Sequence, residues 1–152
     1  MGPGKAPAGV AVTPDGRHVY TANNTDADGD IDPHIDAPSG VALTPDSRRA
    51  YITHYRPTTV SVIDTASNTV TATIPVDTYP DRVAVAPDGR HAYTANNSAD
   101  TVSVIDTASN TVTATIPVGA GPIGVAVAPD SRHAYTANNS AGTVSVIDTG
   151  AG

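Results

Sequence analysis

The sequence predicts an all-β protein built from tandem copies of one module of four short antiparallel strands. The composition is the first reason. The 152 residues include no Cys, Trp or Phe, one Met, 13 Gly and 13 Pro, and Val, Thr and Ala are abundant, which favours strands and tight turns over helices. The second reason is a turn motif that recurs along the chain, and the third is the alternation of apolar and polar residues between turns.

The repeat is found by comparing the chain with itself. The motif Thr/Ala-Pro-Asp-Gly/Ser recurs with its proline at Pro14, Pro45, Pro87 and Pro129, so the successive spacings are 31, 42 and 42. A second proline, in the small-residue turn that opens each copy, follows the same spacings at Pro7, Pro38, Pro80 and Pro122. Residues 59–76 are identical to residues 101–118. Because such periods indicate repeat architectures, we divide the chain into copies at about 4–37, 38–79, 80–121 and 122–152.

Each full copy predicts four strands. In the third copy we expect them at 82–86, 91–96, 101–106 and 111–118, separated by the turn motifs P-D-G-R and T-A-S-N-T, whose Pro, Asp, Asn and Gly residues favour turns. In the copy before it, Val70, Ala72 and Ile74 alternate with threonines, as on a strand with one apolar face. Four short antiparallel strands in one repeat of this length are typical of one blade of a β-propeller.

The copy number predicts an open arc of two complete blades flanked by two partial ones. The last copy ends after its third strand, and the first is shorter than the repeat by one strand and a turn, with Ile31 and Ile35 in a degenerate third strand. An open arc exposes sheet faces and edges that invite self-association. We therefore expect a homodimer, in which two copies close one ring through their incomplete blades. A fragment of a larger propeller is the alternative.

The repeat resembles a known family. The pattern G-V-A-V-x-P-D-G-R-x-x-Y-x-A-N-N followed by T-V-S-V-I-D-T-x-x-N-T-V-x-A-T-I-P-V is similar to the YVTN β-propeller repeat of bacterial and archaeal surface and periplasmic proteins, and it covers nearly the whole chain. Thr94 and Ala95 stand where the family has Val-Ala. The resemblance implies an extracellular or periplasmic location. Surface-layer modules, lactonase-like enzymes and lyases all share such repeats, so it implies no single function.

The copies diverge on one rim of the predicted propeller. Successive connections between antiparallel strands alternate between two rims, and the rim with the P-D-G/S-R and T-A-S-N-T turns is nearly invariant. On the other rim, the second copy and the crossing that follows it carry charged and aromatic residues that the later copies lack. These are His54, Tyr55, Arg56, Asp77, Tyr79, Asp81 and Arg82. Because binding sites accumulate on loops held by a rigid scaffold, we predict a binding surface here. Drift in solvated loops is the alternative.

An acidic segment in the first copy predicts a calcium site. Residues 24–32 fit the pattern D/N-x-D-x-D-G-x-x-D, which supplies the hard oxygen ligands that calcium requires. The expected ligands are Asn24, Asp26, Asp28, Asp32 and the backbone carbonyl of Asp30. The EF-hand version would need Glu at its twelfth position, where Ile35 stands, so the hairpin-loop version fits better. A disordered acidic loop is the alternative.

Other repeated polar residues predict structural roles. The equivalent positions His18, His91 and His133 are expected on the surface of a strand, and His34 is a poor calcium ligand because nitrogen is softer than oxygen. The strand-end residues Asp64, Asp106 and Asp148 are expected to accept hydrogen bonds from backbone amides in the turns that follow them.

Charge narrows the range of partners. With 15 acidic and 8 basic residues the net charge is -7, which is unfavourable for binding nucleic acid or anionic lipid. No run of about 20 apolar residues predicts a membrane span, and residues 1–9 lack the apolar core of a signal peptide.

The sequence contains no catalytic triad, phosphate-binding loop or Cys/His metal set. The first hypothesis is therefore a non-enzymatic scaffold or binding module that self-assembles through its incomplete terminal blades. A lactonase-like or lyase-like enzyme using His54, Tyr55, Arg56, Asp77 and Asp81 is the alternative. The near-identity of the copies also fits an engineered propeller fragment.

Overall fold

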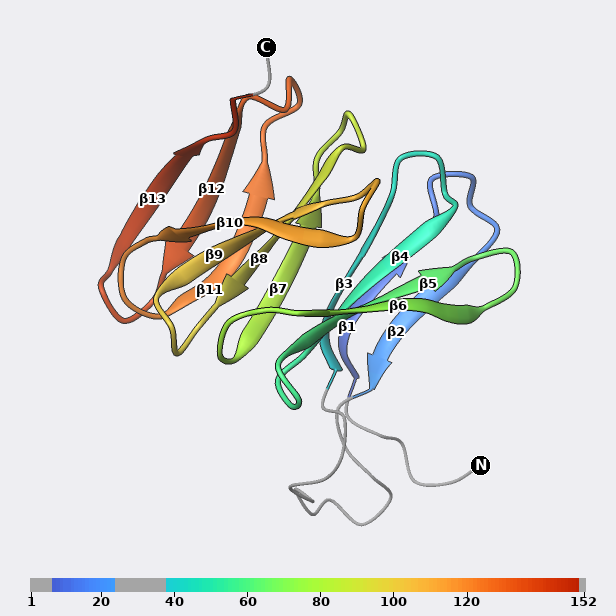
Figure 1. Cartoon of the computed structure of the whole chain (residues 1–152), viewed down its shortest axis with the longest axis horizontal. Helices are drawn as coiled ribbons and strands as arrows, with labels where there is room; N and C mark the ends of the chain where they lie inside the picture. Colours follow the sequence, from blue (N-terminus) through green and yellow to red (C-terminus); the bar gives the residue numbers. More distant parts are fainter. Residues whose placement is uncertain (1–6, 24–37, 151–152) are drawn as a thin grey trace.

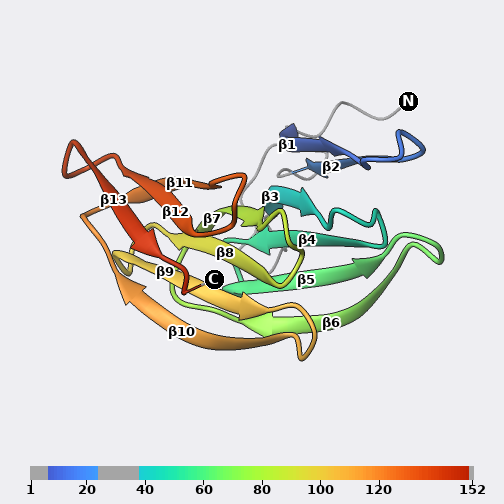
Figure 2. The same ribbon diagram turned by 90° about the horizontal axis from the view of Figure 1, so that it is seen from above.

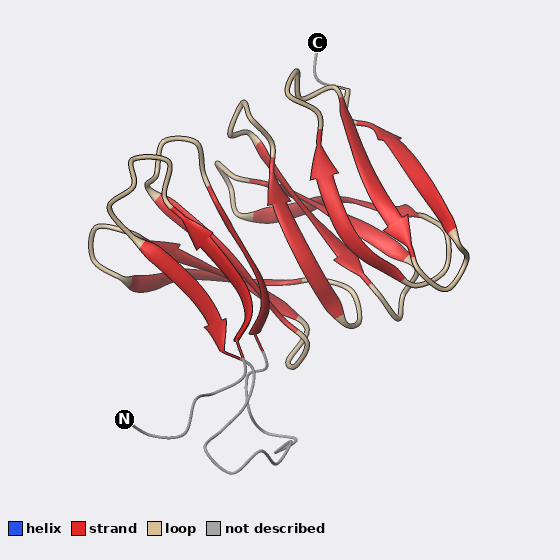
Figure 3. Cartoon of the chain, turned by 180° about the vertical axis from the view of Figure 1, so that it is seen from behind, coloured by secondary structure: helices blue, strands red, loops and turns tan. Residues whose placement is uncertain are grey.

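The computed structural model describes residues 7–23 and 38–150, which form strands, turns and loops without any helix. Figure 3 shows this all-β composition. The strands are β1 (Pro7–Val12), β2 (Val19–Asn23), β3 (Pro38–Leu43), β4 (Arg49–His54), β5 (Thr59–Asp64), β6 (Thr69–Pro75), β7 (Pro80–Val85), β8 (His91–Asn96), β9 (Thr101–Asp106), β10 (Thr111–Pro117), β11 (Pro122–Val127), β12 (His133–Asn138) and β13 (Thr143–Asp148). Within the described part of the chain, no helix has the length and apolar character needed to cross a membrane.

The strands form four separate antiparallel sheets, which we number as blades 1 to 4. Blade 1 is β1-β2, blade 2 is β3-β4-β5-β6, blade 3 is β7-β8-β9-β10 and blade 4 is β11-β12-β13. Within every blade, strands that are consecutive in the sequence pair with one another. The prediction of two complete blades flanked by two partial ones is confirmed for the described residues (Figure 1).

The four blades are arranged as an open arc. The first strands of successive blades contact one another, β1 with β3, β3 with β7 and β7 with β11. The fourth strands β6 and β10 lie along the outer side, as the view from above shows (Figure 2). Blades 1 and 4 are the two ends of the arc.

Strand boundaries follow the prediction closely in the middle of each blade. In blade 3, β8 and β9 occupy 91–96 and 101–106 as expected. The first strand, β7, starts at Pro80, slightly earlier than predicted, and its register shifts between Pro80 and Val83. The same irregularity occurs between Pro38 and Val41 in β3. A bulge breaks the alternation of side chains, so periodicity alone could not locate the start of these strands.

The core lies between neighbouring blades. One cluster joins Tyr51, Val60, Val62 and Ile74 of blade 2 to Val83, Ala92 and Ile105 of blade 3. The next cluster repeats this arrangement, with Tyr93, Val102 and Val104 of blade 3 against Ala134 and Ile147 of blade 4, flanked by Val125 and Val127. Each blade thus has two different faces. We call the one that carries the tyrosine the tyrosine face. The opposite one, which carries two valines of the first strand, or Val41 and Leu43 in blade 2, is the valine face.

Hydrogen bonds fix the order in which the faces meet. The Tyr20 hydroxyl of blade 1 donates to Asn68 Oδ1 of blade 2 at 2.8 Å. The Tyr51 hydroxyl of blade 2 donates to Asn110 Oδ1 of blade 3 at 3.0 Å. The tyrosine face of each blade therefore meets the valine face of the blade that follows.

The repeated aspartates have the structural role predicted for them. Asp64 Oδ1 accepts hydrogen bonds from the backbone amides of Ala66 and Ser67, at 3.0 and 2.9 Å. These contacts, led by the Ser67 amide, lower the pKa of Asp64. Asp148 Oδ1 accepts one from the Gly150 amide at 2.9 Å. These side chains close turns by satisfying amides that the strands leave unpaired.

Candidate binding surface

The divergent loops of the second copy lie together at one end of the strands. The turn that follows β4 and the crossing from β6 to β7 are both at the lower end of the molecule in Figure 1. The nearly invariant turns between first and second strands lie at the upper end. This separation is the one that strand alternation predicts.

Tyr55 and Asp81 meet across two blades. The Tyr55 hydroxyl donates to Asp81 Oδ1 at 3.0 Å. Tyr55 directly follows β4 of blade 2, and Asp81 is the second residue of β7 in blade 3. Burial, and next the negative charge of Asp81, raise the pKa of Tyr55 to about 12. The phenol therefore keeps its proton at neutral pH and acts as a hydrogen-bond donor.

Two buried hydroxyl groups hold Asp81 in place. The backbone carbonyl of Asp81 accepts from Ser39 Oγ at 2.7 Å and from Thr53 Oγ1 at 2.8 Å. Both side chains are buried, and Thr53 Oγ1 also accepts from the Gly40 amide at 2.8 Å. Because β3 and β4 both hold this carbonyl, the carboxylate of Asp81 is positioned for Tyr55 by the core of the blade.

Tyr79 and Arg56 extend this contact. Arg56 Nη2 donates to the Tyr79 hydroxyl at 3.3 Å, and the rings of Tyr55 and Tyr79 lie with centroids 6.0 Å apart at an interplanar angle of 51°. We call Tyr55, Arg56, Tyr79 and Asp81 the rim cluster. It combines two phenols, a carboxylate and a guanidinium.

The backbone of Tyr79 is strained. Its φ is 55°, in the left-handed region, and the equivalent residue of the next crossing is Gly121, with a φ of 66°. A side chain costs about 1–2 kcal/mol in this conformation, which glycine adopts freely. The aromatic side chain of Tyr79 thus stands at a position that glycine would fill at lower cost, which distinguishes this crossing from the next one.

The other three predicted residues, His54, Asp77 and Arg82, make contacts of their own, and Arg82 also lies beside the rim cluster, with its Nε 4.0 Å from Asp81 Oδ1. His54 is the last residue of β4 and is buried. Asp77 Oδ2 accepts from Thr101 Oγ1 of blade 3 at 3.1 Å. Arg82 Nη1 donates to the backbone carbonyls of Ala8 at 2.8 Å and Ser39 at 2.7 Å. Asp77 and Arg82 thus contact neighbouring blades, and their place in the binding surface stays a prediction.

Sequence reasoning missed Ser39 and Thr53. Thr53 stands where the other three copies have Ala22, Ala95 and Ala137. This replacement of alanine by a residue with a hydroxyl group was the sequence signal for the hydrogen bond from Thr53 to the Asp81 carbonyl. The sequence also carried a signal of the backbone strain at Tyr79. When the crossing before blade 3 is aligned with the crossing before blade 4, Tyr79 falls at the position of Gly121.

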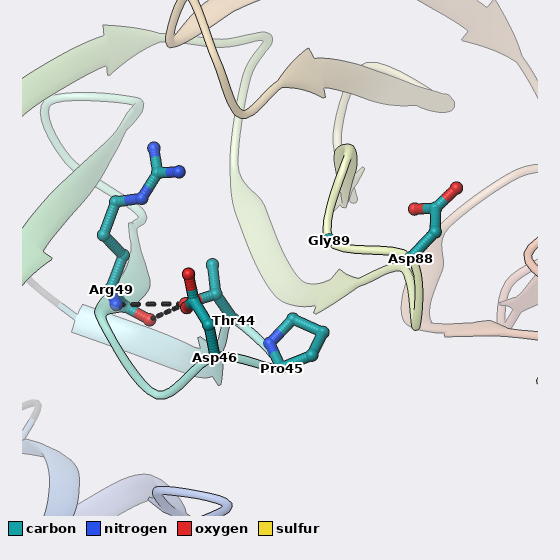
Figure 4. A pocket seen from close by; sticks show the side chains of 6 residues that line it. All are labelled: Thr44, Pro45, Asp46, Arg49, Asp88 and Gly89. Carbon is teal, nitrogen blue, oxygen red and sulfur yellow. Dashed lines mark hydrogen bonds between the residues drawn. The ribbon is translucent and has the colours of Figure 1, made fainter.

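The opposite rim contains a pocket of about 170 Å³ between blades 2 and 3. Its lining residues are Thr44, Pro45, Asp46, Arg49, Asp88 and Gly89 (Figure 4). The Thr44 hydroxyl donates to Asp46 Oδ1 at 2.6 Å and accepts from the Arg49 amide at 3.0 Å. The Arg49 guanidinium donates to the backbone carbonyl of Thr107. These polar groups serve the turns themselves, and we assign the pocket to the structure.

The predicted calcium ligands Asn24, Asp26, Asp28, Asp30 and Asp32 lie outside the described residues, as do Ile31, His34 and Ile35. Within residues 7–23 and 38–150, no group of three or more His, Asp or Glu side chains is arranged to hold a metal ion. The histidines at the equivalent strand positions pack beside tyrosines, with ring centroids 6.4 Å apart for His91 and Tyr93. These contacts fit the strand-surface role predicted for them.

Antiparallel blades arranged around adjacent first strands define the β-propeller class of fold. No family model matches the chain, and no curated protein matches it by sequence. Solved structures similar to this chain include the following two. Hydrazine synthase of Kuenenia stuttgartiensis is 25% identical, with a TM-score of 0.81 over 95% of this chain and 46% of that chain. A functionally unknown protein from Desulfotomaculum acetoxidans DSM 771 is 19% identical, with a TM-score of 0.73 over 93% of this chain and 55% of that chain. This chain thus spans about half the length of each, and the likeness concerns the fold.

Proposed function

We propose that the chain is a β-propeller scaffold that performs no catalysis, self-associates through its incomplete terminal blades, and presents the rim cluster to a partner. The observation that carries this proposal is the distribution of exposed apolar side chains. Of the nine large hydrophobic residues exposed among the described ones, six are on β1, β2, β12 and β13, in the two end blades. Contiguous exposed apolar surface marks an interaction site.

The proposal includes that the chain belongs to the proteins built from YVTN-type repeats. It is supported by the motif that recurs in every copy and by the four-blade arc. A location on the cell surface or in the periplasm accompanies this membership.

The rim cluster is the proposed contact surface for a partner. It offers a phenol that keeps its proton, a carboxylate and a guanidinium beside two aromatic rings. Tyr and Arg are the residues that most often contribute binding energy at protein interfaces. The cluster therefore suits a polar protein surface with both hydrogen-bond donors and acceptors.

Catalysis is the weaker candidate. The enzyme alternative requires His54, Tyr55, Arg56, Asp77 and Asp81 to converge on one substrate. Asp77 instead contacts Thr101 in the next blade. The raised pKa of Tyr55 also makes it a poor general base at neutral pH.

Calcium binding by the acidic segment of residues 24–32 is a further part of the proposal. It is supported by the ligand pattern in the sequence. The mutual repulsion of Asp26, Asp28, Asp30 and Asp32, which stand at alternate positions, also supports it, because a divalent cation would relieve that repulsion.

The molar mass in solution tests the scaffold proposal. We expect light scattering after size-exclusion chromatography to give twice 15.3 kDa at micromolar concentration in calcium. A fall to the mass of one chain in chelator would place the ion in the assembly, and an unchanged mass would support association that does not depend on calcium. The mass of one chain in both buffers would contradict self-association.

A further inference from the structure

The free face of blade 4, at the end of the arc, is a tyrosine face, and no strand among the described residues packs against it. Tyr135, Val144 and Val146 are 41%, 65% and 61% exposed. The equivalent residues of blade 2, Tyr51, Val60 and Val62, are 0% exposed because blade 3 covers them. Blade 4 therefore exposes the side chains that blade 2 buries against its neighbour, so a further blade would fit against this surface.

The outer face of blade 1 is the complementary valine face. Val10, Val12 and Val19 are 66%, 57% and 62% exposed. They stand at the positions of Val83, Val85 and Ala92, which pack against the tyrosine face of blade 2 within the chain. Each end of the arc thus carries one half of the interface that joins its internal blades.

A glycine marks where the missing strand would lie. A Cβ atom added at Gly40 in β3 would come within 2.8 Å of the Asp81 carbonyl oxygen and 3.1 Å of Arg82 Cα in β7. Gly124 occupies the equivalent position in β11, and there a Cβ atom would meet nothing within 4 Å. Gly124 therefore leaves room beside β11 for a following first strand, and no strand of the described chain occupies that space.

The turns at the invariant rim continue this pattern. Ser47 Oγ of blade 2 accepts from the Asp15 amide of blade 1, and Ser131 Oγ of blade 4 accepts from the Asp88 amide of blade 3, both at 3.1 Å. Between blades 2 and 3, Gly89 stands in place of this serine and lies against Pro45. Blade 1 also has glycine here, Gly16, with open space around its Cβ position. A blade 4 to blade 1 junction would therefore be of the same kind as the junction between blades 2 and 3.

We infer that the tyrosine face of blade 4 binds the valine face of blade 1 of a second copy, and that two copies joined twice in this head-to-tail manner close one ring of blades. The inference rests on the proposed scaffold function and assigns its partner and interface. A tyrosine face meets a valine face between blades 2 and 3 and between blades 3 and 4, and the Tyr20 contact with Asn68 gives blades 1 and 2 the same order. We therefore expect unlike faces to pair between copies as well. Two chains of four blades give eight, within the range of about 4–8 blades that closed propellers have.

Two single substitutions test this geometry. Val12→Lys damages only the valine face, and Val146→Glu damages only the tyrosine face. In a head-to-tail ring, each variant alone has both junctions disrupted, and we expect a mass of 15.3 kDa for each. In an equimolar mixture, one junction is wild-type, and the other joins the introduced lysine of one copy to the introduced glutamate of its partner. We therefore expect the mixture to recover twice that mass.

The controls separate this inference from the scaffold proposal. Val70→Lys places the same charge on β6, at an exposed position of the outer side, and should leave the dimer intact. Circular dichroism of the separate variants should match the wild type, because Val12 and Val146 are exposed in the single chain. A dimeric wild type whose variants fail to recover on mixing would overturn the head-to-tail assignment alone. A monomeric wild type would overturn self-association itself.

Discussion

The phenol of Tyr55 keeps its proton far above neutral pH because it is partly buried and donates to a carboxylate. Its pKa in the folded chain is about 12, against about 10 for an unfolded tyrosine. The unfolded chain therefore loses this proton first as the pH rises. The contribution of Tyr55 to folding stability is fully present below about pH 10 and is lost as the pH rises towards 12.

Titration of single residues tests this account of the rim. The difference in ultraviolet absorbance of tyrosinate between the wild type and Tyr55→Phe isolates the ionisation of Tyr55 from those of Tyr51 and Tyr93, whose pKa values burial also raises. We expect a midpoint near pH 12, and a lower one in Asp81→Asn, which removes the charge that opposes ionisation. A midpoint near that of an unfolded tyrosine in the wild type would show that the Tyr55 to Asp81 contact does not form.

Single residues were predictable where the repeat itself reports their role. Asp64 and Asp148 recur at strand ends, and the turn chemistry of Asp alone predicts the contacts they make. The anchoring of Asp81 by Ser39 and Thr53 was not predictable, because it depends on how closely two blades approach. The same holds for the contacts of Asp77 with Thr101 and of Arg82 with Ser39, which join residues far apart in the sequence.

At the scale of elements, the spacing between first strands limits which residues they can carry. β3 and β7 approach so closely at Gly40 that a methyl group would fall within 2.9 Å of Thr53 Oγ1 and 2.8 Å of the Asp81 carbonyl oxygen. This contact lies beneath the rim cluster. Gly40 is therefore required by the close packing of β7 in the neighbouring blade, and not by the conformation of β3 itself.

Alanine at the two equivalent glycines should have opposite effects. We expect Gly40→Ala to destabilise the chain by about 1–3 kcal/mol, as overpacking does in cores, whereas Gly124→Ala should be neutral or stabilise by up to about 1 kcal/mol, because alanine loses less backbone entropy than glycine. Urea unfolding of both variants in the Val146→Glu background measures this without association. Equal losses of stability would show that β11 is already covered.

Strands were predictable from alternation wherever the pairing is regular. β8 and β9 match the predicted ranges, whereas β7 starts at Pro80 before a shift of register. The position of a bulge depends on how the first strands of neighbouring blades pack together, and this packing cannot be read from the sequence of one strand.

At the scale of the whole molecule, the described residues form two full and two partial blades in an open arc, whose two end faces no described strand covers. Sequence reasoning predicted the arc and led us to expect a dimer joined through the incomplete blades, but it did not say which faces would meet. The three-dimensional arrangement distinguishes the two ends of the arc. Val10 and Val12 at one end belong to a valine face, and Tyr135 and Val144 at the other belong to a tyrosine face, the two kinds of face that meet at each internal interface.

Covalent trapping across the junction tests this account most directly, because the chain contains no cysteine of its own. Val12 and Val146 are changed to cysteine, together in one variant and separately in two others, and each protein is treated with a short reagent that joins two thiols. We predict that the double variant gives a covalent species of twice 15.3 kDa on a denaturing gel, while both single variants stay at the mass of one chain. Cross-linking of a single variant, or a double variant that stays at one chain mass, would contradict head-to-tail closure.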